Sequence, residues 1–541
     1  MDPLADLRAA VQAAARSLHP VQDGGPVLSL ERPRREGFGD YATNAAMVMA
    51  PALREPPREI AERLGGALAD TLGAALERVE VAGPGFLNLF LSDDWHRAAL
   101  HRVLQQGAGF GAAPAGRSER VDVEFVSANP TGPMHVGHAR NAAYGDALSR
   151  LLAFQGHAVT REFYVNDAGS QVLRFGESIA ARARGEEPPE DGYRGDYVRE
   201  LAAEIPDAGV GDPRHVAHRG IDLMLERTRA SLTAFGVDFD VWFSERTLHE
   251  GAPAPVQRAL ARLDELGQTY RSDGALWVRT SAHGDDKDRV LERSSGEHTY
   301  FASDIAYLLD KLDRGFERLI YVLGADHHGF VGRMKASCET LGSDPDRLEL
   351  LIMQFVHLVR RGERASMSKR KGEFVTLDEL VAEIGVDAAR WFLLQRSHDT
   401  AMDLDLDLAR EQSSENPVYY VQYAHARIAS VLEKAGSDRV ARALAAGAAE
   451  GELHPAERVL VKRLLAFPGE VAEATERRAP HRIAGYALEL AQDFTAFYRD
   501  CRVVGAEPEA LESFRIALAV AAQGVIARSL GLLGVSAPEA M

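Results

Sequence analysis

A strand, a histidine-bearing turn and a helix follow one another around residue 130, and this stretch constrains the fold more than any other. Val121, Val123 and Phe125 alternate with charged residues, which is the period of a half-buried strand. Between residues 139 and 152 the apolar residues fall on one helical face, and Gly156 marks the end of that helix. This order predicts an α/β unit whose ligand lies at the carboxyl end of the strand.

Two histidines, His135 and His138, lie one helical turn apart where this predicted helix begins. A helix N-terminus presents unpaired N–H groups and the positive end of the helix dipole, which favours a phosphate. Imidazoles spaced i, i+3 can donate to the same anion. A single histidine near a helix start is more often a solvated capping residue. The pair directly after a strand therefore favours a phosphate site.

The rest of the chain predicts three domains. Residues 1–110 mix helical and turn-rich stretches and indicate a small α+β domain. Residues 120–407 alternate strands and helices, which predicts a doubly wound parallel sheet with an insertion over roughly 185–290. Residues 408–541 are amphipathic helix almost throughout and predict an all-α domain.

Within the central domain the pattern places several further elements. Strands are predicted at 158–165, at 319–323 and within 348–359, and a helix opens near residue 170. Thr376 begins another helix through a capping box with Glu379. Parallel strands joined by helices bring ligands to the carboxyl ends of the strands, where the histidine turn already lies.

Composition excludes several classes of protein. The 541 residues carry a net charge of −18, so any nucleic-acid contact must come from local arginine patches. Cys338 and Cys501 are the two cysteines, too few for a disulfide framework or a cysteine-rich zinc site. The first residues lack a basic-then-apolar signal pattern, and no run approaches the roughly 20 apolar residues of a membrane span. We therefore expect a cytoplasmic protein that does not bind membranes.

Lysine is rare in this chain, and its few positions are informative. Only seven of the 62 basic residues are lysines, so arginine supplies almost every generic positive charge. Lys369 and Lys371 lie two residues apart in a basic, glycine-bounded loop over residues 360–372. Such a loop is suited to close on a triphosphate, although any basic run taken alone is more often simply solvated.

Other nucleotide motifs are absent from the sequence. Residues 107–112 match G-x-G-x-x-A, but they follow a helical pattern and precede a strand, the reverse of what a dinucleotide fingerprint requires. Neither G-x-x-x-x-G-K-[ST] nor H-E-x-x-H occurs. The histidine turn and the lysine loop therefore carry the functional prediction.

These two stretches resemble a known family. His135-Val-Gly-His138 resembles the HIGH signature of class I aminoacyl-tRNA synthetases, and residues 124–140 as a whole resemble that region of arginyl-tRNA synthetases. Residues 366–370, Ser-Met-Ser-Lys-Arg, resemble the second signature, KMSKS, with Ser366 and Arg370 replacing its first lysine and last serine. The lysine that meets the phosphates in this family is kept as Lys369, and the resemblance extends over essentially the whole chain.

The resemblance implies a class I fold with an anticodon-binding C-terminal domain, and it implies catalytic roles for His135, His138 and Lys369. These groups would stabilise the negative charge that builds on the α-phosphate when a carboxylate attacks it. ATP would bind as its Mg²⁺ complex, with no structural metal and no covalent nucleophile from the protein. The expected ATP-binding residues are Thr131, Gly132, Pro133, His135, Gly137, His138, Met367, Ser368 and Lys369.

An arginine substrate requires carboxylates that can pair with a planar guanidinium. Tyr300 and Asp304 share a helical face and resemble the arginine-binding segment of the family, so Asp304 is expected to bind the guanidinium. Glu124 and Asn129 match the strand–turn positions that hold the substrate, and Asn129 is expected at the α-amino end.

Two further carboxylates are weaker candidates for the same site. Glu245 ends the run Trp-Phe-Ser-Glu, and Asp326 lies at the end of a predicted strand. A lone carboxylate is usually just a surface charge, so the sequence favours a binding role for these two residues only slightly over that alternative.

The C-terminal domain offers candidate tRNA contacts. Tyr420 and Tyr423 lie three residues apart, with Arg427 one turn further on. Aromatic faces can stack on splayed anticodon bases, and an arginine can pair with phosphate. The alternative is a tyrosine stripe packed in the helical core. In the family the N-terminal extension meets the tRNA elbow, and arginine activation typically needs bound tRNA.

The resemblance as a whole implies an ATP-dependent arginine–tRNA ligase, with tRNA(Arg), L-arginine and ATP as partners and a monomer as the expected state. Two alternatives compete with it. One is another nucleotidyl transferase with a HIGH-type turn, which the Tyr300 and Asp304 segment disfavours. The other is an RNA-binding paralogue with an inactive site, which the intact His135, His138 and Lys369 disfavour.

Overall fold

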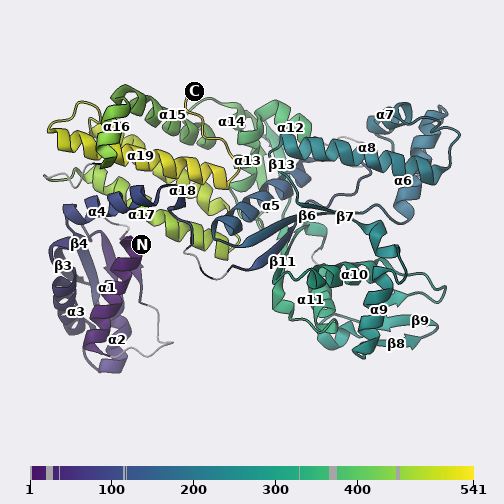
Figure 1. The fold of residues 1–541 in the computed structure, drawn as a ribbon, viewed down its shortest axis with the longest axis horizontal. Helices are drawn as coiled ribbons and strands as arrows, with labels where there is room; N and C mark the ends of the chain where they lie inside the picture. The colour runs from purple at the N-terminus through teal and green to yellow at the C-terminus, as the bar shows by residue number, and fades with distance from the viewer. Residues whose placement is uncertain are drawn as a thin grey trace.

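The structure is a computed structural model, and Figure 1 shows an elongated molecule with the N-terminal lobe at one end of a helical block and a branched α/β region at the other. The described residues are 3–19, 28–33, 35, 37–113, 116, 118–327, 329–364, 375–445 and 451–541.

The N-terminal lobe is a four-stranded antiparallel sheet covered by helices. Its strand order is β1–β2–β4–β3, and β3 and β4 form an antiparallel hairpin. The strands are β1 (Leu30–Glu31), β2 (Tyr41–Thr43), β3 (Leu76–Ala82) and β4 (Phe86–Leu91). The helices are α1 (Pro3–Leu18), α2 (Ala45–Leu53), α3 (Pro57–Leu72) and α4 (Asp93–Gln106).

The central sheet is parallel and doubly wound, as predicted. Its order is β12–β11–β5–β6–β7, so the chain starts in the middle, winds outward over β6 and β7, and returns to the other side of β5 with β11. The strands are β5 (Arg120–Glu124), β6 (Ala158–Val165), β7 (Val241–Ser244), β11 (Arg318–Gly324) and β12 (Leu348–Met353). The order reverses between β5 and β11, where such sheets open a ligand crevice.

The sheet is covered by α5 (Val136–Phe154), α10 (Tyr300–Asp313) and α11 (Phe330–Thr340). Helix α6 (Ser170–Ala183) also follows a strand in the chain, but it lies away from the sheet (Figure 1). Helix α5 approaches β5 very closely, because a Cβ on Gly145 would lie 2.2 Å from Cγ of Phe125. Only glycine allows this packing, which sets the histidine turn directly over the end of β5.

The segment expected as one insertion over 185–290 differs from that prediction, because it contributes β7 to the central sheet. Only four residues long and partly buried throughout, β7 gives too weak a periodic signal to be found. Before it come α7 (Asp196–Glu204) and α8 (Pro213–Ala234). After it come α9 (Pro255–Glu265) and an antiparallel sheet of β8 (Thr269–Ser272), β9 (Ala275–Val278) and β10 (Arg289–Glu292).

Beyond β12 a small sheet leads into the helical block. Its strands are β13 (Val356–Arg360), β14 (Glu363–Arg364) and β15 (Met402–Asp405), with α12 (Leu377–Ile384), α13 (Val386–Leu394) and α14 (Leu406–Arg410) around them. The block itself contains α15 (Pro417–Ala435), α16 (Ser437–Ala445), α17 (Pro455–Glu476), α18 (His481–Asp500) and α19 (Glu509–Leu532). Short 3₁₀ turns lie at Gly73–Ala75, Gly107–Gly109, Glu245–His249, Thr280–His283, Ala325–His327 and Pro345–Arg347.

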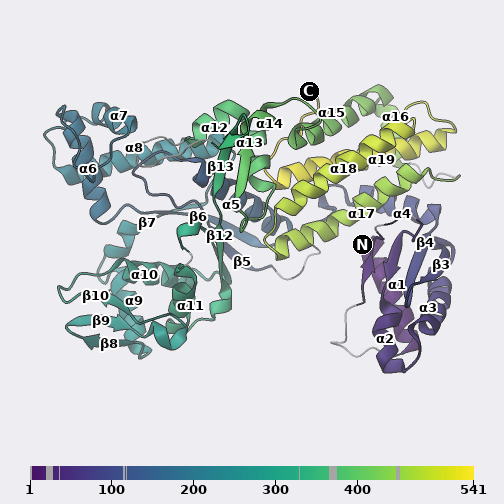
Figure 2. The ribbon, with the colours of Figure 1, turned by 180° about the vertical axis from the view of Figure 1, so that it is seen from behind.

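Helix α19 is long and apolar enough to cross a membrane, and among the described helices no other meets that test. Half of its most apolar stretch is buried inside the protein. It packs against α15, α16 and α18, and Figure 2 shows it running through the helical block. Its composition therefore fits a core helix.

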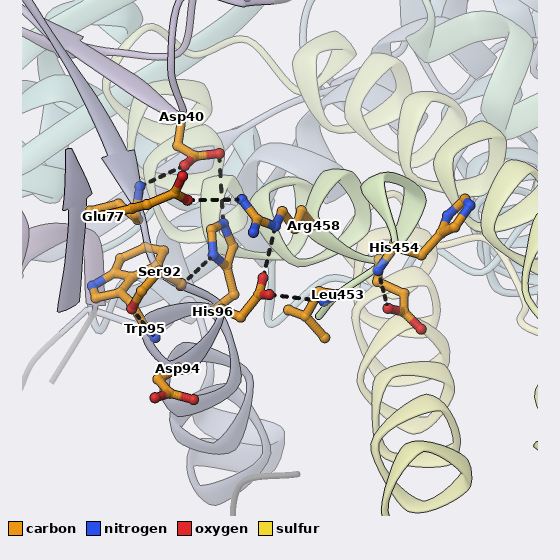
Figure 3. Close-up of polar contacts among 12 residues, drawn as sticks. Asp40, Glu77, Ser92, Asp94, Trp95, His96, Leu453, His454 and Arg458 are labelled. Atoms are coloured by element: carbon orange, nitrogen blue, oxygen red, sulfur yellow. Dashed lines mark hydrogen bonds and ion pairs between the residues drawn. The ribbon is translucent and has the colours of Figure 1, made fainter. Parts of the chain in front are cut away.

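The N-terminal lobe is fixed to the helical block by buried charges (Figure 3). Asp40 Oδ2 accepts the Leu91 N–H at 2.8 Å, and Oδ1 lies 2.8 Å from Lys462 Nζ on α17 and 3.7 Å from Nε2 of buried His96. Burial raises the pKa of the Asp40 carboxyl, but Lys462 and then His96 outweigh it, and the net shift is downward. Arg458 Nε also lies 2.8 Å from Asp93 Oδ1 across this interface.

The charge of Asp40 should therefore stabilise the attachment of the lobe. We expect Asp40→Asn to lower the free energy of unfolding by about 2–4 kcal/mol, because Lys462 then has no anion in a largely buried site. Glu80→Gln is the matched control, since Glu80 pairs with Arg78 in the same lobe with both side chains about half exposed, and it should cost less than about 1 kcal/mol. Equal losses in urea unfolding would refute the role of the buried pair.

Candidate active site

The two predicted histidines lie together at the start of α5. His135 is the N-cap, and its Nδ1 accepts the Gly137 N–H at 3.1 Å. His138 Nδ1 in turn accepts the His135 N–H at 3.2 Å, and the two rings stack with centroids 3.7 Å apart. Since both Nδ1 atoms are acceptors, the neutral rings carry their protons on Nε2. The geometry thus sets two parallel imidazole N–H groups beside the N-terminus of α5.

The turn that leads from β5 to the histidines is strained. Val126 and Ser127 have φ values of 68° and 41°, a left-handed conformation that is unfavourable for any residue but glycine and worst for a β-branched one. Asn141 holds the turn, because its Oδ1 accepts the Val126 N–H at 2.7 Å while its Nδ2 donates to the Val322 carbonyl at 3.0 Å. One amide side chain on α5 therefore ties the crossing after β5 to β11.

The segment that follows the second signature is joined to the histidine turn by backbone hydrogen bonds. The Val136 N–H donates to the Val375 carbonyl at 3.2 Å, and the Leu377 N–H donates to the Met134 carbonyl at 2.9 Å. Thr376 opens α12 with the predicted capping box, confirmed by reciprocal contacts with Glu379. The loop over 365–374, with the predicted Met367, Ser368 and Lys369, lies outside the described residues.

The remaining predicted ATP-binding residues lie on the turn itself and differ in burial. Thr131 is buried, while Gly132 and Pro133 are partly exposed and Gly137 is exposed. The Thr131 carbonyl accepts the hydroxyl of Tyr197, which comes from α7, at 2.8 Å. Local pattern contains no signal for the role of Tyr197, because the contact of α7 with the histidine turn depends on tertiary packing.

Three of the predicted carboxylates gather in one electrostatic cluster. Glu124 ends β5, Glu245 follows β7, and Asp304 lies in the first turns of α10. Burial raises the pKa of Asp304 to about 7, and the charges of Glu245 and Glu124 add to that rise against the opposing effect of Arg333. Burial also raises the pKa of Glu245. Such a cluster is poised to accept a cation, because a bound positive charge would relieve the repulsion.

The other predicted substrate residues are more exposed than the carboxylates of this cluster. Tyr300 is 58% exposed, and with Glu245 it lines a cleft of about 660 Å³. Its ring covers Gly169, whose positive φ and missing Cβ make room for the hydroxyl. Asn129 is exposed on the turn. Asp326 has a side chain that is 83% exposed, and its Oδ2 lies 3.8 Å from His327 Nε2, so among the described residues it is not part of the cluster.

The predicted tRNA residues divide into two kinds. Tyr420 packs against the helical core and donates its hydroxyl to Thr495 of α18 at 3.1 Å, as in the alternative prediction of a packed stripe. Tyr423 is 41% exposed and stacks on Tyr419, and Arg427 lies over its ring at 4.7 Å. Arg427 also lies over the exposed ring of Tyr498 at 5.5 Å. Local pattern missed Tyr419 and Tyr498, because their contacts depend on side-chain direction and on α18.

Within the described ranges, no group of three or more histidine, cysteine or acidic side chains is arranged to hold a metal ion. The carboxylates of the cluster instead lie among tyrosines, and Tyr164 donates to Glu245. The absence of a structural metal stays a prediction.

Family models match the chain along most of its length. Residues 5–91 match the arginyl tRNA synthetase N terminal domain. Residues 99–187 and 221–430 match the class I (R) tRNA synthetase catalytic domain, and residues 421–541 match the DALR anticodon binding domain. The histidine turn and the carboxylate cluster therefore fall within the matched catalytic region.

Whole-chain relatives agree with these matches. The chain is 45% identical to an arginine–tRNA ligase of Desulfosudis oleivorans, over 99% of both chains, and 45% identical to one of Geobacillus thermodenitrificans, over 95% of both. Among solved structures, the arginyl-tRNA synthetase of Thermus thermophilus superposes with a TM-score of 0.77 at 26% identity over 99% of both chains. That of Plasmodium falciparum shares the fold, with a TM-score of 0.75 at 18% identity over 99% of this chain and 98% of that one.

The charge state of the cluster predicts how the site responds to pH. The pKa of Asp304 is about 7, so a guanidinium bound beside it would favour the ionised form and would displace a proton below that pH. The affinity for L-arginine should therefore decrease by up to about tenfold per pH unit between about pH 7 and pH 6. Calorimetry in buffers of different ionisation enthalpy would measure the proton release, and the Asp304→Asn variant should lack it. A pH-independent affinity in the wild type would contradict the prediction.

Proposed function

Because this chain belongs to the arginyl-tRNA synthetase family, we propose that its site activates L-arginine with ATP and transfers the arginine to the 3′-terminal adenosine of tRNA(Arg). AMP and pyrophosphate are released. The observation that carries the proposal is the stacked pair of His135 and His138 at the switch point of the sheet, beside a buried carboxylate cluster.

In the first step a carboxylate oxygen of arginine attacks the α-phosphorus, and the bond to the pyrophosphate oxygen breaks. Negative charge builds on the phosphate oxygens, and the Nε2–H groups of His135 and His138 would stabilise it together with Lys369. Mg²⁺ enters as part of the ATP complex and neutralises the pyrophosphate. A hydroxyl of the terminal ribose then attacks the arginyl carbonyl, and AMP leaves.

Arginine selectivity is assigned to the three carboxylates. Asp304 and Glu245 are proposed to face the guanidinium, since the charge of Glu245 opposes the ionisation of Asp304 until a cation arrives. Glu124 is proposed at the α-amino end together with Asn129. Tyr300 would cover the ligand from the cleft. Asp326 keeps only a peripheral place in the proposal, because its side chain points to solvent.

Recognition of tRNA is proposed for two ends of the molecule. The N-terminal lobe would meet the elbow, and the exposed pair of Tyr423 and Arg427 on α15 would meet the anticodon. An acidic protein can bind RNA in this way, because the stacking of a base on an aromatic ring does not require a net positive charge. The net charge of −18 is consistent with contacts that are local.

The proposal includes a monomer that acts in the cytoplasm. Both cysteines are buried and free, which suits a reducing compartment. Among the described residues, the exposed large apolar side chains Phe38, Val210 and Phe355 lie in three separate connecting segments and not side by side on one helix or strand.

ATP–pyrophosphate exchange across the twenty amino acids, with and without tRNA, tests the proposed function. Exchange with arginine, strongest in the presence of tRNA, is the expected result. Exchange with a different amino acid would indicate another enzyme with a HIGH-type turn. No exchange with any amino acid, together with intact tRNA binding, would indicate an RNA-binding paralogue.

Asp304→Asn tests the assignment of the guanidinium. The change keeps the size of the side chain but removes a charge, and losing the charged partner of a buried cation typically costs about 2–5 kcal/mol. The KM for arginine should therefore rise by roughly 30-fold or more, while the KM for ATP changes little. An unchanged arginine KM would remove Asp304 from the site.

The two tyrosines of α15 should respond differently to substitution by leucine. Tyr423→Leu removes an exposed stacking face, so the KM for tRNA should rise about tenfold with little change in melting temperature. Tyr420→Leu removes a packed ring and its hydrogen bond to Thr495, so it should lower the melting temperature without a selective effect on tRNA. The reverse pattern in aminoacylation and thermal unfolding would mean that the anticodon contacts lie elsewhere.

A further inference from the structure

Lys311 is a buried cation that the reaction as described does not use. It lies near the end of α10 with no exposed surface, and it is one of the seven lysines of the chain. Burying an ammonium group is costly unless anions compensate for its lost hydration. The position therefore calls for anionic partners. The structure places Asp122 and Glu124 close to the ammonium group and Glu162 Oε1 further away, at 3.7 Å.

The ammonium group of Lys311 joins two carboxylates of β5. Its Nζ lies 2.6 Å from Asp122 Oδ2 and 2.7 Å from Glu124 Oε2. The rings of Tyr307 and Tyr321 lie 4.5 and 4.3 Å from it, where their faces stabilise a cation. Asp122 and Glu124 are two residues apart on one strand, so their side chains share one face of the sheet, the face that α10 covers.

The other oxygen of Glu124 is also fixed. Its Oε1 accepts the hydroxyl of Ser127 at 3.1 Å, and that hydroxyl accepts the Tyr164 N–H at 3.1 Å. Both carboxylate oxygens of Glu124 therefore have partners, one on α10 and one on the strained turn. A rotation of this carboxylate away from the cluster would break at least one of these bonds.

Around Lys311 the carboxylates outnumber the cations. Glu162 of β6 is already paired with Arg314, at 2.6 and 2.9 Å. Burial raises the pKa of Asp122 to about 6, although Lys311 opposes that rise. Two sets of ionisable groups surround Lys311 and Glu124. Those near Lys311 are Asp122, Glu162, Tyr307, Asp310, Arg314 and Tyr321. Those near Glu124, in or beside the carboxylate cluster, are Tyr164, Glu245 and Asp304. With Arg314 committed to Glu162, Lys311 is the cation that compensates Asp122 and Glu124.

We propose that Lys311 is a positioning residue for substrate recognition, which holds the Glu124 carboxylate oriented toward the amino-acid site without touching the substrate. This inference rests on the proposed function, because it assigns Glu124 to the binding of arginine. The competing account is a purely structural pair, in which Lys311 serves only to neutralise Asp122.

The variants Lys311→Met and Lys311→Met/Asp122→Asn separate these accounts. The single change leaves two buried carboxylates without a cation, and the double change removes one positive and one negative charge together. Lys462→Met is the matched control, because it makes the same substitution in a buried ion pair at the interface with the N-terminal lobe. All are assayed at saturating tRNA by ATP–pyrophosphate exchange and by thermal unfolding.

The proposal predicts that Lys311→Met raises the KM for arginine about tenfold or more, the scale of losing one charged hydrogen bond, with the KM for ATP nearly unchanged. In this variant the arginine KM should fall as pH rises, because Asp122, whose pKa burial already raises against the effect of Lys311, would retain a proton to higher pH without the cation. The double variant should regain melting temperature but keep the raised arginine KM. Lys462→Met should lower the melting temperature and leave the arginine KM as in the wild type.

A double variant with the wild-type arginine KM and pH profile would overturn the proposal and support the purely structural pair. If Lys311→Met does not fold, the double variant still decides between the accounts, since its net charge equals that of the wild type. Failure of the proposed function itself gives a different result, namely a wild-type protein that shows no exchange with arginine.

Discussion

The hydrogen bonds of Asn141 fix the point on which the site depends. Val126 and Ser127 leave β5 in a left-handed conformation, and the amide of Asn141 holds that turn while also bonding to β11. Strain of this kind persists only where the surrounding structure over-determines it. The direction of the turn then sets where α5 begins, and thus where His135 and His138 point.

Helix α5 connects the histidine turn to the small sheet and also joins the two halves of the central sheet. Its Arg140 is buried and donates to the carbonyls of Gln354, Ser397 and Thr400 at 2.7–3.0 Å. These carbonyls flank the small sheet of β13, β14 and β15. A guanidinium suits this task, because its planar donors can reach three acceptors at once. The histidine turn and the small sheet are therefore fixed relative to each other although they lie far apart in the chain.

The buried carboxylates of this acidic chain are of two kinds, those paired with a cation and those without one. Cations are placed where carboxylates need compensation, as with Lys311 beneath β5 and Lys462 beside Asp40. Asp304 and Glu245 carry no such close partner in the cluster, and burial together with mutual repulsion raises the pKa of Asp304. The same interior therefore contains compensated carboxylates, which stabilise the fold, and others whose compensation is left to a ligand.

The sequence by itself determined the features that local chemistry controls. The alternation around Val123, the apolar face of α5 and the capping box at Thr376 are each written within a few residues, so β5, α5 and α12 could be predicted. The histidine pair follows from the same local spacing. By contrast, β7 is too short to show a period, and it was hidden within a predicted insertion.

Tertiary structure alone decided which distant side chains meet. Lys311 is 189 residues from Asp122, and Tyr197 reaches Thr131 from α7. It also decided that Tyr420 packs inward while Tyr423 faces solvent. The reason is physical: periodicity fixes which residues share a face of one element, but the partner of that face depends on how all the elements pack, which no local pattern encodes.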